Sequence, residues 1–176
     1  VVNEVSGPHS TCQTRTHLGE EWKQKGLWGA YCTDMRARNS PFAKPSPLPL
    51  EEYYDVYVGR RAKEYLEAYQ GEQPWFCHVS FGGPHEPWDT PEPYASLYAP
   101  EDMPDPLPRM RHLGENRPKG EFDRLAEKKK IQCTPETARE IRANYCGGVT
   151  LIDHMIGEII EVIRKRGEWD NTVVLF

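Results

Sequence analysis

One histidine of this 176-residue sequence lies in a loop that the surrounding residue types make stiff. The stretch FGGPHEPWDTPEPY follows the apolar run PWFCHVSF and places His85 between two prolines. A proline fixes its own φ near about −65°, and the two glycines before the histidine allow a sharp turn or a close backbone approach. We predict that His85 is a catalytic residue, which stabilises charge on a reacting oxyanion or donates a proton. The alternative is a loop histidine that caps a carbonyl group.

Aromatic and acidic residues follow His85 along the same loop. Trp88, Tyr94 and Tyr98 could stack on a sugar or an aryl ring, although all three could equally cover the core. We predict Trp88 as a substrate-binding residue beside His85. The acidic residues could contact substrate or a cation, but acidic surface loops are common and we predict no metal ligand among them; they are Glu86, Asp89, Glu92, Asp102 and Asp105.

A helix and a strand are predicted to lead into this loop. Apolar residues recur at helical spacing from about Glu51 to Gln70, with acidic residues in the first turn and Gly71 as the stop. The apolar run 75–81 is typical of a short buried strand. The histidine therefore follows the carboxyl end of a strand.

A second helix and strand are predicted near the end of the sequence. The helix runs from Pro135 to about Arg166, with Thr134 as N-cap, and the strand is 172–176. Gly147-Gly148 should cost about 1 kcal/mol each relative to alanine, so we expect close backbone packing there. Asp153 is expected to be partly buried and His154 to be solvated. The predicted apolar stripe consists of Ile141, Tyr145, Val149, Ile152, Ile156, Ile159 or Ile160, and Ile163.

The order of these elements indicates an α/β protein with a mainly parallel sheet flanked by helices. Ligands of such sheets bind beyond the carboxyl ends of the strands, where His85 would lie. The remaining sequence is expected to be less regular. It comprises an irregular start with a short helix around 20–25, a proline-rich loop at 31–50, a long loop at 82–118, and a short charged helix or disorder at 119–133.

Composition excludes several classes of function. No apolar run reaches the roughly 18–20 residues that span a bilayer, so no membrane span is predicted. The net charge is −5 and no basic stripe contains aromatic residues, which argues against nucleic-acid binding. The five cysteines form no CxxC pair, and zinc-site spacing is absent. The absence of an initiator methionine and the final apolar run TVVLF suggest a fragment excised from a longer protein.

Three segments resemble the sulfatase family of the alkaline-phosphatase superfamily. They are PWFCHVSFGGPHEPWDTPEPY, ANYCGGVTLIDHMIGEIIEVIRKRGEWDNTVVLF and LPLEEYYDVYVGRRAKEYLEAY. The resemblance implies that 1–176 is the central part of a sulfatase catalytic domain. It also implies hydrolysis of a carbohydrate or aryl sulfate ester, in which His85 binds the sulfate and assists protonation of the leaving oxygen. Export to the periplasm or the extracellular space is implied by the resemblance alone.

The rest of the family's active site is expected outside this sequence. The resemblance implies a formylglycine nucleophile and a divalent cation, usually calcium. CTDMR at Cys32 lacks the required Pro or Ala, and CTPET at Cys133 has Thr137 in place of Arg, so we reject both as the nucleophile motif. Two alternatives therefore stay open: a phosphodiesterase or phosphonate monoester hydrolase of the same superfamily, and a non-catalytic binding relative.

Overall fold

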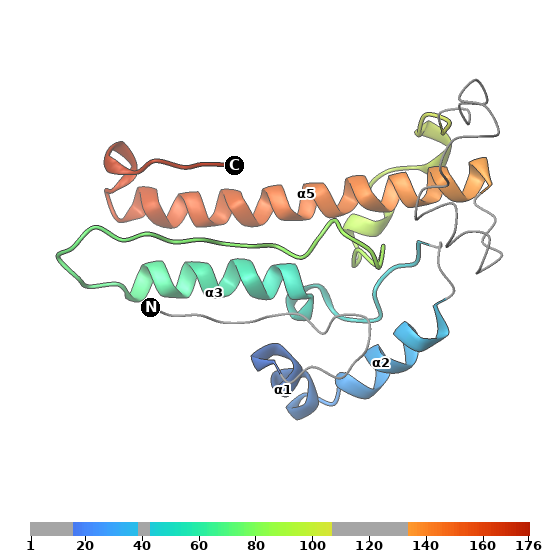
Figure 1. Ribbon diagram of the computed structural model, residues 1–176, viewed down its shortest axis with the longest axis horizontal. Coiled ribbons are helices and arrows are strands. Elements are labelled where there is room, and N and C mark those ends of the chain that lie inside the picture. The colour runs from blue at the N-terminus through green and yellow to red at the C-terminus, as the bar shows by residue number, and fades with distance from the viewer. Residues whose placement is uncertain (1–15, 39–42, 107–133) are drawn as a thin grey trace, which may run out of the picture.

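The computed structural model describes residues 16–38, 43–106 and 134–176, and two long helices dominate it. Helix α3 (Tyr54–Ala68) and helix α5 (Pro135–Lys165) lie side by side and run in the same direction (Figure 1). They pack closely because Gly59 of α3 faces Met155 of α5, where an added Cβ would lie 3.0 Å from the methionine side chain. The remaining described elements are α1 (His17–Gln24), α2 (Trp28–Ala37) and the 3₁₀ turns Leu50–Glu52, Tyr94–Ser96, Pro100–Asp102 and Trp169–Asn171.

Helix α5 has the predicted ends but a different buried face. The Thr134 side chain accepts a hydrogen bond from the Thr137 amide at 3.2 Å, and Gly167 adopts φ +71° just beyond the C-terminus. The predicted stripe was wrong in part, because Tyr145 and Val149 are 46% and 45% exposed. The face that is buried instead contains many small or polar residues, namely Thr137, Ala143, Asn144, Gly147, Gly148, Leu151, Met155, Val162 and Ile163.

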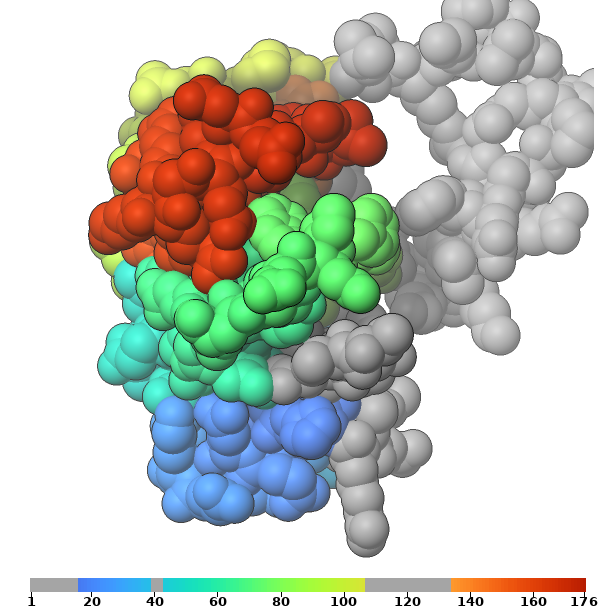
Figure 2. All heavy atoms as spheres, turned by 90° about the vertical axis from the view of Figure 1, so that its left-hand side faces the viewer, coloured from blue at the N-terminus to red at the C-terminus, as the bar shows by residue number. Residues whose placement is uncertain are grey.

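Helices α1 and α2 are neighbours and lie below α3 (Figures 1 and 2). The short helix predicted around 20–25 is confirmed as α1, whose N-cap Thr16 accepts from the Gly19 amide at 2.9 Å. Gly26 follows it with φ +74°, the left-handed region that glycine tolerates. Helix α2 was not predicted. The two helices share one hydrophobic cluster with α3, made of Leu18, Trp22, Tyr31, Leu48 and Tyr57.

The two segments predicted as strands are extended but form no sheet within the described part of the chain. Segments 75–81 and 172–176 both run opposite to α3 and α5, and hence parallel to each other, as Figure 1 shows. Exposure alternates along 75–81, as in a strand with one face covered: Trp75 and Cys77 pack against α3 and α5, whereas Phe76 is 89% exposed. The predicted parallel sheet is therefore not confirmed.

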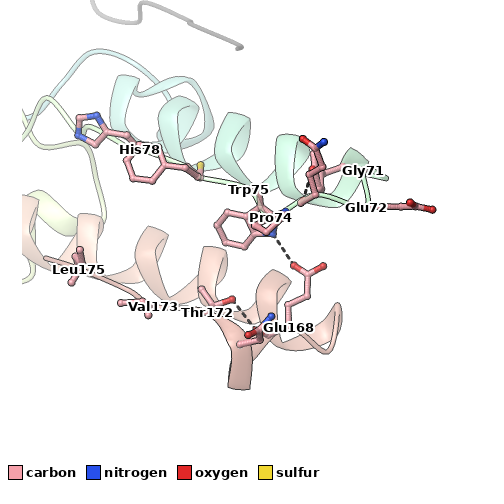
Figure 3. Close-up of a pocket in the computed structure, with 14 residues that line it drawn as sticks. Gly71, Glu72, Pro74, Trp75, His78, Glu168, Thr172, Val173 and Leu175 are labelled. Atoms are coloured by element: carbon pink, nitrogen blue, oxygen red, sulfur yellow. Dashed lines mark hydrogen bonds between the residues drawn. The ribbon is translucent and has the colours of Figure 1, made fainter.

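An open groove is lined by the two extended segments. Its volume is about 650 Å³, and residues 71–78 and 168–175 contribute most of its lining (Figure 3). Neighbouring strands of a sheet lie about 4.8 Å apart and share backbone hydrogen bonds, and no such pairing is assigned to these two segments. Trp75 closes one end by donating to the Glu168 carboxylate at 2.9 Å.

Within the described ranges, no helix is long and apolar enough to cross a membrane.

Candidate functional site

His85 lies at the tip of a loop that we define as the His85 loop, residues 82–89. Its side chain is exposed, and its Nδ1 lies 2.7 Å from the Glu86 carbonyl oxygen. A carbonyl only accepts hydrogen bonds, so Nδ1 carries the proton and donates. Nε2 is therefore the ring nitrogen that remains available to bind a substrate.

The start of the His85 loop is bound by a buried carboxylate of α3. Asp55, in the first turn of α3, accepts from the Gly82 amide at 2.8 Å and from the Gly83 amide at 3.1–3.2 Å. The side chain is 1% exposed, and burial raises its pKa to about 6 against the two backbone hydrogen bonds, which lower it. An added Cβ on Gly83 would lie 2.4 Å from Asp55 Oδ2, which accounts for glycine at that position.

The end of the loop is bound by two tyrosines that immediately precede Asp55. The hydroxyls of Tyr53 and Tyr54 lie 3.0 and 3.3 Å from Asp89 Oδ1, and 2.6 Å from each other. Asp89 is fully buried, and among the described residues its Oδ2 has no hydrogen-bond partner. Burial raises the pKa of Asp89 to about 6, although Arg38 and the two hydroxyls lower it. Three consecutive residues at the start of α3 thus bind both ends of the loop.

The chain beyond Asp89 packs directly on α5. The Thr90 amide donates to Asn144 Oδ1 at 3.3 Å, and the Thr90 hydroxyl donates to the Asn144 carbonyl at 3.0 Å. The glycine pair supplies the room: a Cβ on Gly147 would lie 2.2 Å from the Tyr94 carbonyl oxygen, and one on Gly148 would lie 3.0 Å from the Thr90 hydroxyl. The predicted close backbone packing is confirmed.

Burial of Asp89 leads to a pH prediction. The pKa of Asp89 in the folded protein is about 6, above the ordinary 3.8. The contribution of Asp89 to the free energy of unfolding is therefore fully present below about pH 4 and is lost as the pH rises through 6. Asp89→Asn keeps an acceptor for the tyrosines without a charge. We expect wild-type stability to fall relative to this variant by on the order of 2 kcal/mol between pH 4 and pH 7, measured by urea unfolding.

Asp102→Asn is the control for this pH series, because it makes the same chemical change at an exposed position. A constant difference between wild type and Asp89→Asn across the same range would contradict the burial of an ionisable Asp89.

The aromatic residues of the long loop divide into two groups. Trp88 is half-buried, and its carbonyl accepts from the Lys44 amide at 3.1 Å. Tyr94 and Tyr98 instead contact α5, where their hydroxyls bind His154 Nδ1 and the Thr150 hydroxyl. We therefore interpret Tyr94 and Tyr98 as residues that cover the core, whereas Trp88 stays a predicted substrate-binding residue.

One further prediction differs from the structure. Asp153 is exposed, not partly buried, because the helix turns its small residues toward the core. His154 is exposed as expected but also bonds Tyr94. Cys32, rejected as a nucleophile on its motif, is buried in α2, and Cys133 lies outside the described residues.

No metal site is formed by the part of the chain that the structure describes. Within those ranges, no three His, Cys, Asp or Glu side chains are grouped closely enough to hold an ion. These residues therefore do not by themselves fit the divalent cation that the resemblance implies. The groove of Figure 3 is also separate from the predicted site, since neither His85 nor Trp88 lines it.

Comparison with known proteins places this geometry in a family. The family model for sulfatases matches residues 9–176. The chain belongs to the sulfatase family. It is 32% identical over 145 residues to the multifunctional alkaline phosphatase superfamily protein PehA of Trinickia caryophylli, covering 76% of this chain and 28% of that protein. It is 30% identical over 125 residues to an arylsulfatase of Clostridium perfringens (strain 13 / Type A), covering 68% and 24%.

Solved structures show the same fold for this part of the sulfatase family. The phosphonate monoester hydrolase of Agrobacterium radiobacter superposes with a TM-score of 0.67 at 22% identity, covering 90% of this chain and 34% of that one. The corresponding enzyme of Silicibacter pomeroyi gives a TM-score of 0.61 at 21% identity, covering 89% and 34%. This chain spans about a quarter of the length of the curated relatives and about a third of the solved structures.

In this sulfatase-family chain, sequence reasoning missed the carboxylates that fix the loop. Asp89 was only one of five candidate acids, and Asp55 was not singled out. The paired glycines gave a signal, because they indicate a close approach to the backbone, but not which residue approaches. The arrangement presents one exposed imidazole on a backbone bound at both ends, which suits a group that must bind or protonate a substrate in a fixed position.

Proposed function

We propose that the full-length protein containing this chain is a sulfuric ester hydrolase in which His85 acts on the sulfate ester. The observation that supports the proposal most directly is the His85 loop, bound at both ends and presenting an exposed imidazole in a sulfatase-family chain. An arylsulfatase and a choline-sulfatase are among the relatives, which favours a sulfate ester as substrate.

The hydrogen bond at Nδ1 defines what His85 can do. In the neutral ring Nδ1–H donates to the Glu86 carbonyl, so Nε2 can only accept. To donate to a sulfate oxygen or to the leaving oxygen, Nε2 must also carry a proton, which makes the ring an imidazolium. The His85 imidazolium then binds the sulfate electrostatically and transfers its Nε2 proton to the departing oxygen as the S–O bond breaks.

The other reacting groups belong to the proposal through the family resemblance alone. A formylglycine nucleophile and a divalent cation, with calcium the expected ion, would come mainly from residues outside 1–176. Trp88 would contact the organic part of the ester, as its half-buried ring in the His85 loop allows. The extended segments 75–81 and 172–176 would be strands of a mainly parallel sheet in the full-length protein, and the groove between them has room for a further strand.

A second candidate is hydrolysis of phosphonate monoesters or phosphodiesters. It is favoured by the multifunctional relative and by the two phosphonate monoester hydrolases that share the fold. The mechanism for His85 would be the same, because both substrates present anionic oxygens and an alkoxide or aryloxide leaving group.

The test compares 4-nitrophenyl sulfate with 4-nitrophenyl phenylphosphonate on the full-length protein, since both release the same phenol. We expect a larger kcat/KM for the sulfate. A larger value for the phosphonate would replace the first candidate by the second. If neither ester releases the phenol while the protein still binds sulfate, the result would contradict the proposed hydrolase activity and support a non-catalytic binding relative.

A further inference from the structure

The backbone before His85 is bound to α3 through one side chain. Asp55 accepts three hydrogen-bond contacts from the start of the loop: Oδ1 accepts from Gly82 and Gly83, and Oδ2 accepts from Gly83. Gly83 is two residues from His85. The position of that short connection therefore depends on a carboxylate of the first turn of α3.

Within the described ranges, Asp55 binds backbone amides and not a positively charged side chain. No lysine, arginine or histidine of the described ranges forms an ion pair with Asp55, although the side chain is 1% exposed. A buried carboxylate without a cation is costly unless its oxygens accept hydrogen bonds, and here two backbone amides supply them. A short, charge-assisted contact to backbone fixes position more strongly than apolar packing would.

The glycines show that the sequence is adapted to this contact. A Cβ on Gly83 would lie 2.4 Å from Asp55 Oδ2 and 3.3 Å from Ile152 Cδ1 of α5, and a Cβ on Gly82 would lie 3.3 Å from the Tyr54 ring. Only a residue without a side chain allows the loop to approach the carboxylate this closely. The loop is thus held between the start of α3 and the middle of α5.

We propose that Asp55 is a positioning residue, which sets the orientation of His85 by binding the Gly82 and Gly83 amides. The expected effect of Asp55 on turnover rests on the proposed hydrolase function. The expected effect of Asp55 on the position of the loop does not. In this proposal Asp55 makes no direct contact with substrate. It acts by fixing the backbone from which the imidazole projects.

The test uses Asp55→Ala and Asp55→Asn in the full-length protein, with Ala62→Gly as the matched control. Ala62 is buried two turns further along α3, so its replacement weakens the same helix without contacting the loop. Asparagine keeps Oδ1 for both amides but puts an NH₂ group in place of Oδ2, so it should restore function in part.

The first readout is hydrogen exchange, which needs no activity. We expect the amides of Gly82 and Gly83 to exchange at least about tenfold faster in Asp55→Ala, with an intermediate rate in Asp55→Asn and wild-type rates in Ala62→Gly. Unchanged exchange in Asp55→Ala, or equal acceleration in Ala62→Gly, would overturn the proposal.

The second readout is turnover per folded molecule. Misplacement of His85 should lower kcat by about 10- to 100-fold in Asp55→Ala with little change in KM, and asparagine should recover part of the loss. A purely structural role predicts the same kcat as Ala62→Gly and would overturn the positioning role. If the wild type hydrolyses neither ester while exchange at Gly82 and Gly83 still depends on Asp55, the proposed hydrolase fails and the structural part of the proposal stands.

Discussion

Replacing His85 with alanine in the full-length protein is expected to lower kcat for a sulfate ester by about 10²–10⁴-fold. The exposed ring would supply both a positive charge for the sulfate and a proton for the leaving oxygen, and alanine supplies neither. His17→Ala is the matched control, because His17 is an exposed histidine at the start of α1, and its loss should leave kcat unchanged.

The leaving group separates the two parts of this role. Nitrophenolate departs readily without a proton, whereas an alkoxide needs one, so proton donation predicts a much larger loss with an alkyl or carbohydrate sulfate than with 4-nitrophenyl sulfate. An equal loss with both substrates would contradict proton donation and leave sulfate binding as the role of His85. An unchanged kcat with both would contradict any role in turnover.

Replacing Gly147 with alanine is expected to destabilise the full-length protein by about 1–3 kcal/mol, although alanine is the better helix former. The added Cβ would lie 2.2 Å from the Tyr94 carbonyl oxygen and 3.0 Å from its carbonyl carbon. These are backbone atoms, so either the loop or the helix must move. The midpoint of urea unfolding should fall accordingly.

Gly157 provides a matched control on the same helix. Apart from the helix's own backbone, no atom of the described residues lies within 4 Å of a Cβ built there, and the residue is exposed, so Gly157→Ala should stabilise the protein by about 0.5–1 kcal/mol. Opposite shifts in the two variants are the expected result. If both midpoints rise together, the Tyr94 backbone does not contact α5 as described.

The features that could be predicted from the sequence are those with local causes. Thr134 caps α5 through a residue three positions away, and Gly167 ends it through its own φ. Helix α3 follows from the spacing of its apolar residues, although it begins at Tyr54 after a 3₁₀ turn and ends at Ala68, two residues short of the prediction. The loop histidine was visible because prolines and glycines restrict or free the backbone at known positions.

The features that could not be predicted depend on distant partners. Asp55 binds amides 27 and 28 residues away, and Asp89 binds hydroxyls 35 and 36 residues away, so neither pattern appears along the sequence. The buried face of α5 was misjudged because glycine, alanine and asparagine carry no apolar signal, yet they allow the closest contacts. The predicted strand pairing is not confirmed in the described residues, because a strand needs a neighbouring strand to pair with.

The packing of the 75–81 segment has a consequence for synthesis of the protein. Trp75 and Cys77 are covered by Leu66, which precedes them, and by Val162 and Ile163, which follow roughly 90 residues later. A ribosome adds about 5–20 residues per second, so the segment emerges some seconds before α5 exists to cover it. Phe76 is exposed even afterwards. This part of the nascent chain is therefore where a chaperone that binds extended apolar segments would act.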